Sequence, residues 1–325
     1  MRTTTLGTNG PEVGVIGLGC MGMSYAYDMQ AERDDETAVS VIRGAIGLGA
    51  TLIDTADVYG PYTNEELVGR ALRGGFREQA VLSTKVGLEI SNAAPAAGTM
   101  PGLVKNGRPE HIRESIDGSL RRLGTDHVDL YILHRVDPQV PLEESWGAMA
   151  QAVQDGKARA IGLSEASVEQ IQLAQSVHPV TAVQSELSLW TRDRLSDVVP
   201  YCEANGLAFL PFSPLGRGFL TGRFTSFEDL PADDMRRRLP RFQQENLRTN
   251  LAIVQRVRDV AERVGATPGQ VALAWVAAQG RRVIPIPGTK TPKHLRENVA
   301  AADLMLSDED LAMLDNAPQP EGSRY

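Results

Sequence analysis

The 325-residue sequence predicts one α/β domain, residues 1–325, folded as a closed (β/α)8 (TIM) barrel. Strand-length apolar segments alternate with helix-length amphipathic segments along almost the whole chain, and this alternation predicts a parallel sheet with right-handed crossovers. Eight such pairs can be counted, and a chain of this length suits one eight-stranded barrel. The first and sixth strands are weakly marked, so a doubly wound open sheet stays as the alternative.

Each predicted strand is a short apolar run that ends at polar residues or at a turn. In chain order the strands cover residues 13–17, 51–54, 81–84, 129–133, 158–163, 182–184, 208–211 and 283–286. Residues 3–13, with Asn9 and Gly10 at a turn, are expected to form a β-hairpin that caps the bottom of the barrel.

The segments between these strands carry apolar residues at helical spacing. The clearest apolar faces belong to the first and third helices, with Ala38, Val39, Ile42, Ala45 and Ile46 in one and Ile112, Ile116, Leu120 and Leu123 in the other. Helix starts are marked by Pro109, by a capping box of Ser167 with Gln170, and by Thr267 before Pro268.

Two connections are longer than a barrel needs, residues 86–108 and 222–249. Each follows a predicted strand, so both are expected at the carboxyl-terminal face of the barrel. Long loops inside compact domains are usually lids or binding loops. We therefore expect these two segments, together with residues 21–30, to surround a substrate.

The composition excludes several classes of function. A net charge of −8 and a pI near 5.3 provide no attraction to nucleic acid or to an anionic membrane. The longest apolar run, residues 271–278, is far shorter than a membrane span, and no signal peptide is evident. Cys20 and Cys202 form neither a disulfide framework nor a metal site. The expectation is a soluble, cytoplasmic enzyme without a metal.

A glycine motif at Gly17, Gly19 and Gly22 matches the dinucleotide-binding pattern G-x-G-x-x-G. That pattern requires a helix directly after the motif and an acidic residue about 20 positions further on. Here residues 24–35 intervene before a convincing helix, and Asp54 lies 32 residues after Gly22. We interpret the motif as a glycine-rich strand end and turn.

Four residues with reactive side chains are expected at one rim of the barrel. Asp54, Lys85 and His134 each come at the end of a predicted strand, and Tyr59 follows Asp54 by five residues. Active sites of such barrels lie at the carboxyl ends of the strands. Each residue alone has an ordinary structural explanation, and only their convergence on one rim indicates a catalytic site.

This combination suits the reduction of a carbonyl group. A nearby ammonium lowers the tyrosine pKa from about 10, so Lys85 can tune Tyr59 while Asp54 holds Lys85 charged. Tyr59 can then protonate an oxygen that gains negative charge as hydride reaches the carbonyl carbon, and His134 can orient that oxygen. A Schiff-base aldolase that uses Lys85 is an alternative, against which Tyr59 argues.

The sequence resembles the aldo-keto reductases over nearly its whole length. The similarity lies in ordered blocks at residues 17–23, 53–60, 83–85, 129–134, 161–165, 183–186, 212–218 and 286–290. The blocks that begin at Leu163 and Ser213 are most similar to the microbial and plant branch of pyridoxal- and perakine-type reductases.

The resemblance implies a (β/α)8 barrel that binds extended NADPH, with Asp54, Tyr59, Lys85 and His134 as catalytic tetrad and Tyr59 as general acid. Ser164 and Gln184 would bind the nicotinamide carboxamide, and Phe212 would stack on the ring. The other implied cofactor contacts are Gly19, Cys20, Met21 and Asp54, then Ser213, Pro214, Leu215, Gly216 and Arg217 along the pyrophosphate, and Gly288, Thr289, Lys290, His294, Glu297 and Asn298 around the adenosine 2′-phosphate.

Three positions depart from the commonest pattern of the family. Phe212 replaces a tyrosine, Glu165 replaces an asparagine, and His294 stands where an arginine is frequent. Lys290 is then the main cation for the 2′-phosphate, so NADH stays open as a weaker alternative. The resemblance implies an NADPH-dependent reductase of a small aldehyde or ketone, with a cofactor-binding redox sensor as the alternative. It leaves a homo-oligomer open.

Overall fold

Seven parallel strands form the centre of the computed structural model, which describes residues 1–24, 33–91 and 102–325. Their order is β11-β10-β9-β8-β5-β4-β3, with crossovers between them as the alternation predicted. The strands are β3 (Leu18–Gly19), β4 (Leu52–Asp54), β5 (Val81–Val86), β8 (Val128–Leu133), β9 (Ala158–Ser164), β10 (Ala182–Glu186) and β11 (Ala208–Phe212).

Residues 283–288 close the sheet into a barrel without forming a regular strand. Val283 makes a parallel bridge with Phe209 on one side, and Gly288 makes one with Gly19 on the other. The expected strand at 283–286 therefore has the right place but lacks a full ladder. Pro285 and Pro287 explain the difference, because proline has no N–H to donate.

The expected first barrel strand at 13–17 is wrong. Glu12–Gly14 instead forms β2, which pairs antiparallel with β1 (Thr3–Thr5), and the barrel strand β3 begins only at Leu18. The predicted hairpin is confirmed. Leu6 and Val13 are buried in the same apolar cluster as Leu52 and Val81 from the starts of the barrel strands, so the hairpin packs against the bottom of the barrel.

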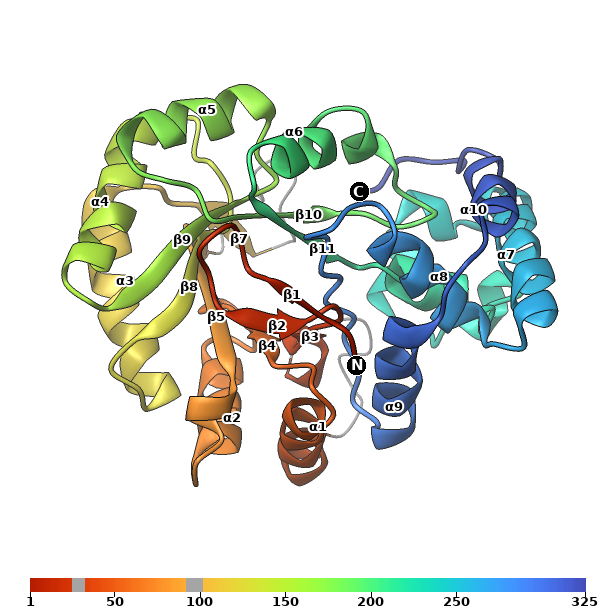
Figure 1. Cartoon of the computed structure of the whole chain (residues 1–325), viewed down its shortest axis with the longest axis horizontal. Coiled ribbons are helices and arrows are strands. Elements are labelled where there is room, and N and C mark those ends of the chain that lie inside the picture. Colours follow the sequence, from red (N-terminus) through yellow and green to blue (C-terminus); the bar gives the residue numbers. More distant parts are fainter. Residues whose placement is uncertain (25–32, 92–101) are drawn as a thin grey trace.

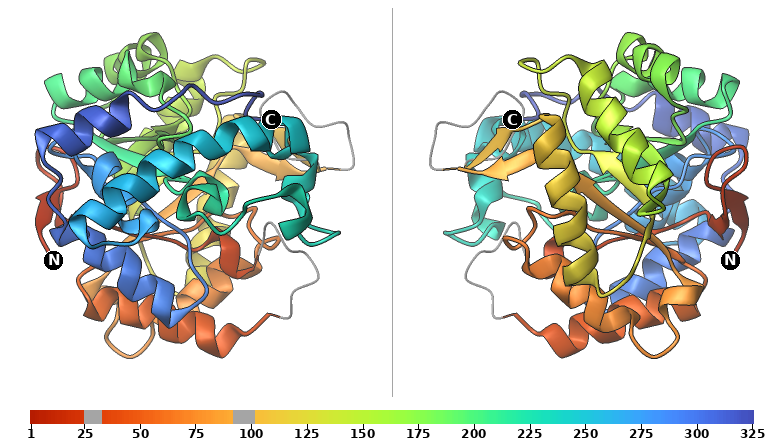
Figure 2. Two further views of the ribbon diagram at one scale, coloured as in Figure 1. Left: turned by 90° about the vertical axis from the view of Figure 1, so that its right-hand side faces the viewer. Right: turned by 90° about the vertical axis from the view of Figure 1, so that its left-hand side faces the viewer.

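Helices surround the barrel on its outer side (Figure 1), and both side views show the same arrangement (Figure 2). The Ser167 capping box begins α5, and Pro109 and Pro268 occupy the first turns of α3 and α8. The helices are α1 (Asp35–Gly47), α2 (Thr63–Leu72), α3 (Pro109–Leu123), α4 (Leu142–Gln154), α5 (Val168–Val177), α6 (Val198–Ala204), α7 (Gln244–Val264), α8 (Pro268–Ala277), α9 (Pro292–Ala300) and α10 (Asp308–Asp315).

The two long connections follow strands β5 and β11, as expected, but residues 244–249 of the second expected connection are helical and begin α7. The first contains an antiparallel pair, β6 (Leu88–Ile90) and β7 (Leu103–Lys105), while residues 92–101 lie outside the described part, as do residues 25–32 of the expected 21–30 loop. The second consists of short 3₁₀ turns up to the start of α7 at Gln244. Within the described ranges no helix combines the length and apolar character needed to cross a membrane.

Candidate active site

The barrel brings the four predicted reactive residues together at one rim. Asp54 is the last residue of β4, Lys85 lies near the end of β5, and His134 directly follows β8. In the ladder, Asp54 pairs with Ser83 and Val86 pairs with Leu133, so these strands end at nearly the same level. The convergence expected from parallel strands is therefore observed.

Lys85 is the buried centre of the cluster, with 0% exposure. Its ammonium donates to Asp54 Oδ1 at 2.5 Å and to the carbonyl oxygen of Thr55 at 2.7 Å. The third contact reaches the Tyr59 hydroxyl at 3.3 Å. An ammonium has three donors, and these three oxygens satisfy all of them.

Asp54 is held by two further donors. Ser83 Oγ and Gln184 Nε2 donate to its Oδ2 at 3.1 and 2.9 Å. Gln184 comes from β10, on the far side of the barrel from β4, so the contact crosses the barrel interior. The expected nicotinamide ligand Gln184 thus uses its amide N–H on Asp54, which leaves its carbonyl oxygen to accept a hydrogen bond.

Tyr59 lies in the turn between β4 and α2 and faces both Lys85 and His134. The Lys85 ammonium is 4.9 Å from the centre of the tyrosine ring, and the His134 ring meets that ring edge-on at 5.9 Å and 84°. Gly60 supports this turn with φ +81°, a conformation that favours glycine. The hydroxyl of Tyr59 therefore meets a buried cation, and its ring packs edge-on against an imidazole.

Burial decides the protonation state of Tyr59. Burial raises the tyrosine pKa above 10, and the opposing effect of Lys85 is smaller. Lys85 does lower the pKa of Tyr59, as expected. Burial raises this pKa by more, so the expectation of a lowered tyrosine pKa is wrong. Burial by itself would lower the pKa of Lys85, but Asp54 and Tyr59 raise it above its usual value. Tyr59 is thus a neutral hydroxyl beside a firmly charged ammonium.

His134 is neutral near pH 7. Burial, the guanidinium of Arg135 and the ammonium of Lys85 hold its pKa well below the usual 6.5. Its Nδ1 is buried and has no hydrogen-bond partner among the described residues. A neutral imidazole beside a neutral phenol can bind the oxygen of a polar substrate without adding charge.

A strip of expected cofactor ligands continues around the same rim. Ser164 ends β9, pairs in register with Gln184 of β10, and both are buried. Phe212 ends β11, is partly buried, and is followed by a turn in which Ser213 and Arg217 have positive φ. Ser164 and Gln184 thus lie side by side, and Phe212 lies two residues further along the neighbouring strand, opposite Glu186.

Arg217 has a different partner from the expected one. Its guanidinium contacts Glu186 with Nη1 to Oε1 at 3.3 Å and Nη2 to Oε2 at 3.0 Å, and both side chains are buried. Arg324, at the end of the chain, also reaches Glu186 at 3.3 Å and pairs with Glu165. Sequence reasoning missed Glu186 and Arg324, and no motif marked Arg324.

The remaining expected ligands gather where the barrel closes. The bridge between Gly19 and Gly288 joins the glycine motif to the start of α9, and a Cβ on Gly19 would lie 2.8 Å from the Ile286 oxygen. This supports the interpretation of the motif as a strand end. Beyond Gly288, Lys290 and His294 are exposed at the start of α9, where Thr289, Glu297 and the buried Asn298 also lie.

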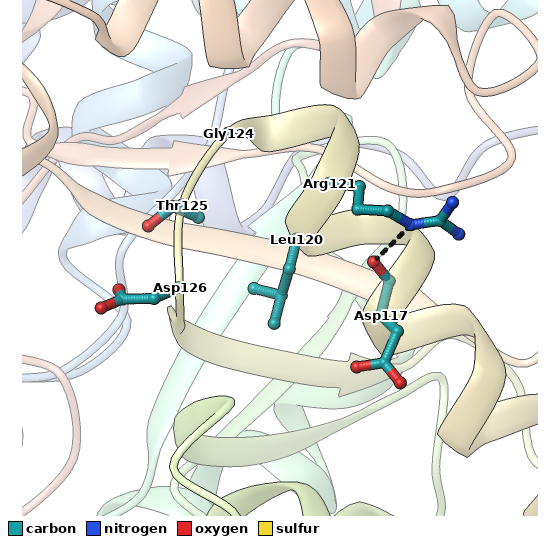
Figure 3. Close-up of a pocket in the computed structure, with 6 residues that line it drawn as sticks. All are labelled: Asp117, Leu120, Arg121, Gly124, Thr125 and Asp126. Carbon is teal, nitrogen blue, oxygen red and sulfur yellow. Dashed lines mark hydrogen bonds between the residues drawn. The ribbon is translucent and has the colours of Figure 1, made fainter.

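Neither a metal cluster of the described residues nor the surface hollow near α3 is part of this site. No group of three or more His, Cys, Asp or Glu side chains in the described ranges is arranged to hold a metal. A surface hollow follows α3 at the amino end of β8 (Figure 3), opposite the catalytic rim; its lining residues are Asp117, Leu120, Arg121, Gly124, Thr125 and Asp126.

Comparisons with known proteins agree with this geometry. The sequence matches the Aldo/keto reductase family over residues 15–318. It is 44% identical over 311 residues to the probable aldo-keto reductase 1 of Glycine max, covering 96% of this chain and 87% of that protein.

A glycerol dehydrogenase from Gluconobacter oxydans has a similar structure, with a TM-score of 0.84 and 32% identity. The match covers 97% of this chain and 94% of that one. An aldo-keto reductase from Klebsiella pneumoniae in complex with NADPH has TM-score 0.75, 28% identity and coverage of 99% and 97%.

Proposed function

Because this chain belongs to the aldo/keto reductase family and is an oxidoreductase, we propose that it reduces an aldehyde or ketone to the alcohol with NADPH, reversibly, and that Tyr59 is the general acid. The observation that carries the proposal is the contact of the Tyr59 hydroxyl with the buried Lys85 ammonium at 3.3 Å, beside a neutral His134.

The residues around the rim fit the chemistry of NADPH, which supplies a hydride from C4 of its nicotinamide when bound. Ser164 and the carbonyl oxygen of Gln184 can bind a carboxamide, and Phe212 offers an aromatic face. At the other end of the strip, Lys290 and the amino terminus of α9 favour an anion such as the 2′-phosphate. A structural relative crystallised with NADPH supports this choice.

In the proposed step, Tyr59 gives its hydroxyl proton to the substrate oxygen as the carbonyl carbon is reduced. The tyrosinate that forms is stabilised by Lys85, whose charge Asp54 secures. The neutral His134 donates a hydrogen bond that holds the substrate oxygen near Tyr59. In alcohol oxidation the same proton returns to Tyr59.

The proposal is tested by Tyr59→Phe, with oxidation of NADPH and NADH measured against an activated aromatic aldehyde such as 4-nitrobenzaldehyde. We expect turnover to fall by about 10²- to 10⁴-fold, the usual contribution of a general acid, and NADPH affinity to stay near that of the wild type. The wild type should prefer NADPH, with NADH as the weaker donor.

Retained turnover in Tyr59→Phe would remove Tyr59 from the chemistry. Tight NADPH binding without turnover by the wild-type protein, on a panel of aldehydes and ketones, would favour the redox-sensor alternative instead.

A further inference from the structure

Arg135 places a positive charge directly beside the reacting groups. It follows His134 at the end of β8, and its side chain is partly buried. Its Nη1 donates to the carbonyl oxygen of His134 at 2.6 Å and to Ser164 Oγ at 3.1 Å. These two bonds fix the guanidinium between the carboxyl ends of β8 and β9.

Both of these bonds use the same nitrogen. A guanidinium carries five N–H donors, and the edge formed by Nε and Nη2 can bind a carboxylate with two parallel hydrogen bonds. Among the described residues, nothing accepts a hydrogen bond from this edge of Arg135, and no carboxylate lies within 4.0 Å of the guanidinium. As far as the described residues go, this donor edge is open to a ligand.

The neighbouring acidic side chains are already committed to other partners. Glu165 accepts the backbone N–H of Glu186 with Oε1 and pairs with Arg324 through Oε2. Glu186 is neutralised by Arg217 and Arg324. The charge of Arg135 contributes to lowering the pKa of Glu165, but within the described residues no carboxylate forms an ion pair with Arg135, so a bound carboxylate would supply that partner.

The charge of Arg135 is close enough to act on the reacting groups. It lowers the pKa of His134 more than Lys85 does, and it opposes the rise of the Tyr59 pKa. Together with the contact to Ser164, this places the guanidinium near His134 and Tyr59, beside the first of the expected cofactor ligands.

We propose that Arg135 determines substrate specificity by binding a carboxylate of the substrate through Nε and Nη2, so that the enzyme prefers aldehydes or ketones that carry an acid group. The inference rests on the proposed carbonyl reduction and narrows its substrate class. Two hydrogen bonds to one carboxylate would also fix the orientation of the carbonyl toward Tyr59.

The test uses 3- and 4-carboxybenzaldehyde and their uncharged methyl esters as paired substrates, with wild type, Arg135→Gln and Arg135→Lys. For the better acid we expect kcat/KM in Arg135→Gln to fall by about 10- to 100-fold more than for its methyl ester, as loss of a charged hydrogen-bonded pair predicts; the loss for the ester measures what Arg135 contributes through Ser164 and His134. The kcat/KM of Arg135→Lys for the acid should lie between those of the wild type and Arg135→Gln. Lysine keeps the positive charge but cannot donate two parallel hydrogen bonds to one carboxylate. Arg113→Gln, on the outer face of α3, is the matched control and should equal the wild type.

An equal loss for acid and ester in Arg135→Gln would overturn the inference, because it would mean that Arg135 only supports Ser164. For each substrate, kcat/KM of the variant is divided by that of the wild type, which removes the difference in intrinsic reactivity between acid and ester. Ester turnover by the wild type tests the proposed reduction separately. If no substrate turns over, calorimetry can measure the binding of 4-(hydroxymethyl)benzoate to the wild type and to Arg135→Gln. Equal affinity for the two proteins would also overturn the inference.

Discussion

At the scale of single residues, the rim that carries Asp54, Tyr59, Lys85 and His134 shows burial and charge acting against each other. Burial raises the pKa of Tyr59 even though Lys85 is in contact with its hydroxyl, whereas burial and two cations lower the pKa of His134. Both residues are thereby neutral at pH 7, and Lys85 remains the charged member beside Asp54. A phenol that keeps its proton is suited to donate it when a stronger base forms on the substrate.

These directions predict the pH dependence of the reaction. Reduction needs protonated Tyr59, so its rate should fall only as pH rises through a pKa above the usual value of about 10. Because the pKa of His134 is lowered, its protonation should become visible only well below about pH 6.5. We expect kcat/KM for aldehyde reduction to be flat from about pH 6.5 to 9, and alcohol oxidation to rise with pH as tyrosinate forms.

The check is a pH profile of kcat/KM for both directions, with Tyr59→Phe as the control. A titration near pH 6.5 that depends on His134 would contradict a neutral imidazole. A fall in reduction between pH 8 and 9 would contradict the raised pKa of Tyr59.

At the scale of elements, the start of α9 is the feature that bears on the choice of cofactor. Thr291 caps the helix by accepting the N–H of His294, Pro292 occupies its first turn, and Lys290 lies just before it without an ion-pair partner in the described part of the chain. Helix amino termini attract anions, and a lysine beside one strengthens that attraction.

Lys290→Ala should therefore weaken NADPH binding by about tenfold, the effect of one charged hydrogen bond, and NADH binding much less. Fluorescence titration of both cofactors measures the difference. Lys293→Ala is the matched control, because Lys293 already faces Glu297 at 3.9 Å on the same helix. Equal losses of NADPH and NADH affinity in Lys290→Ala would show that Lys290 does not contact the 2′-phosphate.

At the scale of the whole molecule, the end of the chain returns to the catalytic rim. Glu321 exchanges hydrogen bonds with Asn250 of α7, and Arg324 joins Glu165 to Glu186. The guanidinium groups of Arg217 and Arg324 lie 5.2 and 5.1 Å from the centre of the Tyr325 ring. Since the amino-terminal hairpin packs below the barrel and this tail packs above it, we propose that residues 1–325 unfold as one domain.

Arg324→Gln should lower the free energy of unfolding by about 1–3 kcal/mol, because it leaves two largely buried carboxylates with less positive charge. Urea denaturation measures this change, with Arg256→Gln on the exposed face of α7 as control. Combining Arg324→Gln with Glu165→Gln should recover part of the loss, since one unpaired charge is removed. A variant as stable as the wild type would show that the tail does not hold the rim together.

Much of this protein can be predicted from its sequence because the relevant information is local. Short apolar runs mark the strands, and the polar residues at their carboxyl ends are Asp54, Lys85 and His134. The error at 13–17 and the incomplete pairing at 283–286 arise where glycine and proline interrupt the apolar runs. There, only pairing with a distant segment decides which residues join the barrel.

The sequence by itself determined the alternation of strands and helices, the identity of the reactive rim and the resemblance that implies NADPH. The tertiary structure alone decided that Gln184 holds Asp54 across 130 residues and that Arg324 meets Glu165 across 159. It also decided that the pKa of Tyr59 is raised and that Arg135 binds Ser164 through Nη1. The reason is physical. The sequence gives the type of each side chain, but its burial, its hydrogen-bond partners and the charges near it depend on contacts between distant segments.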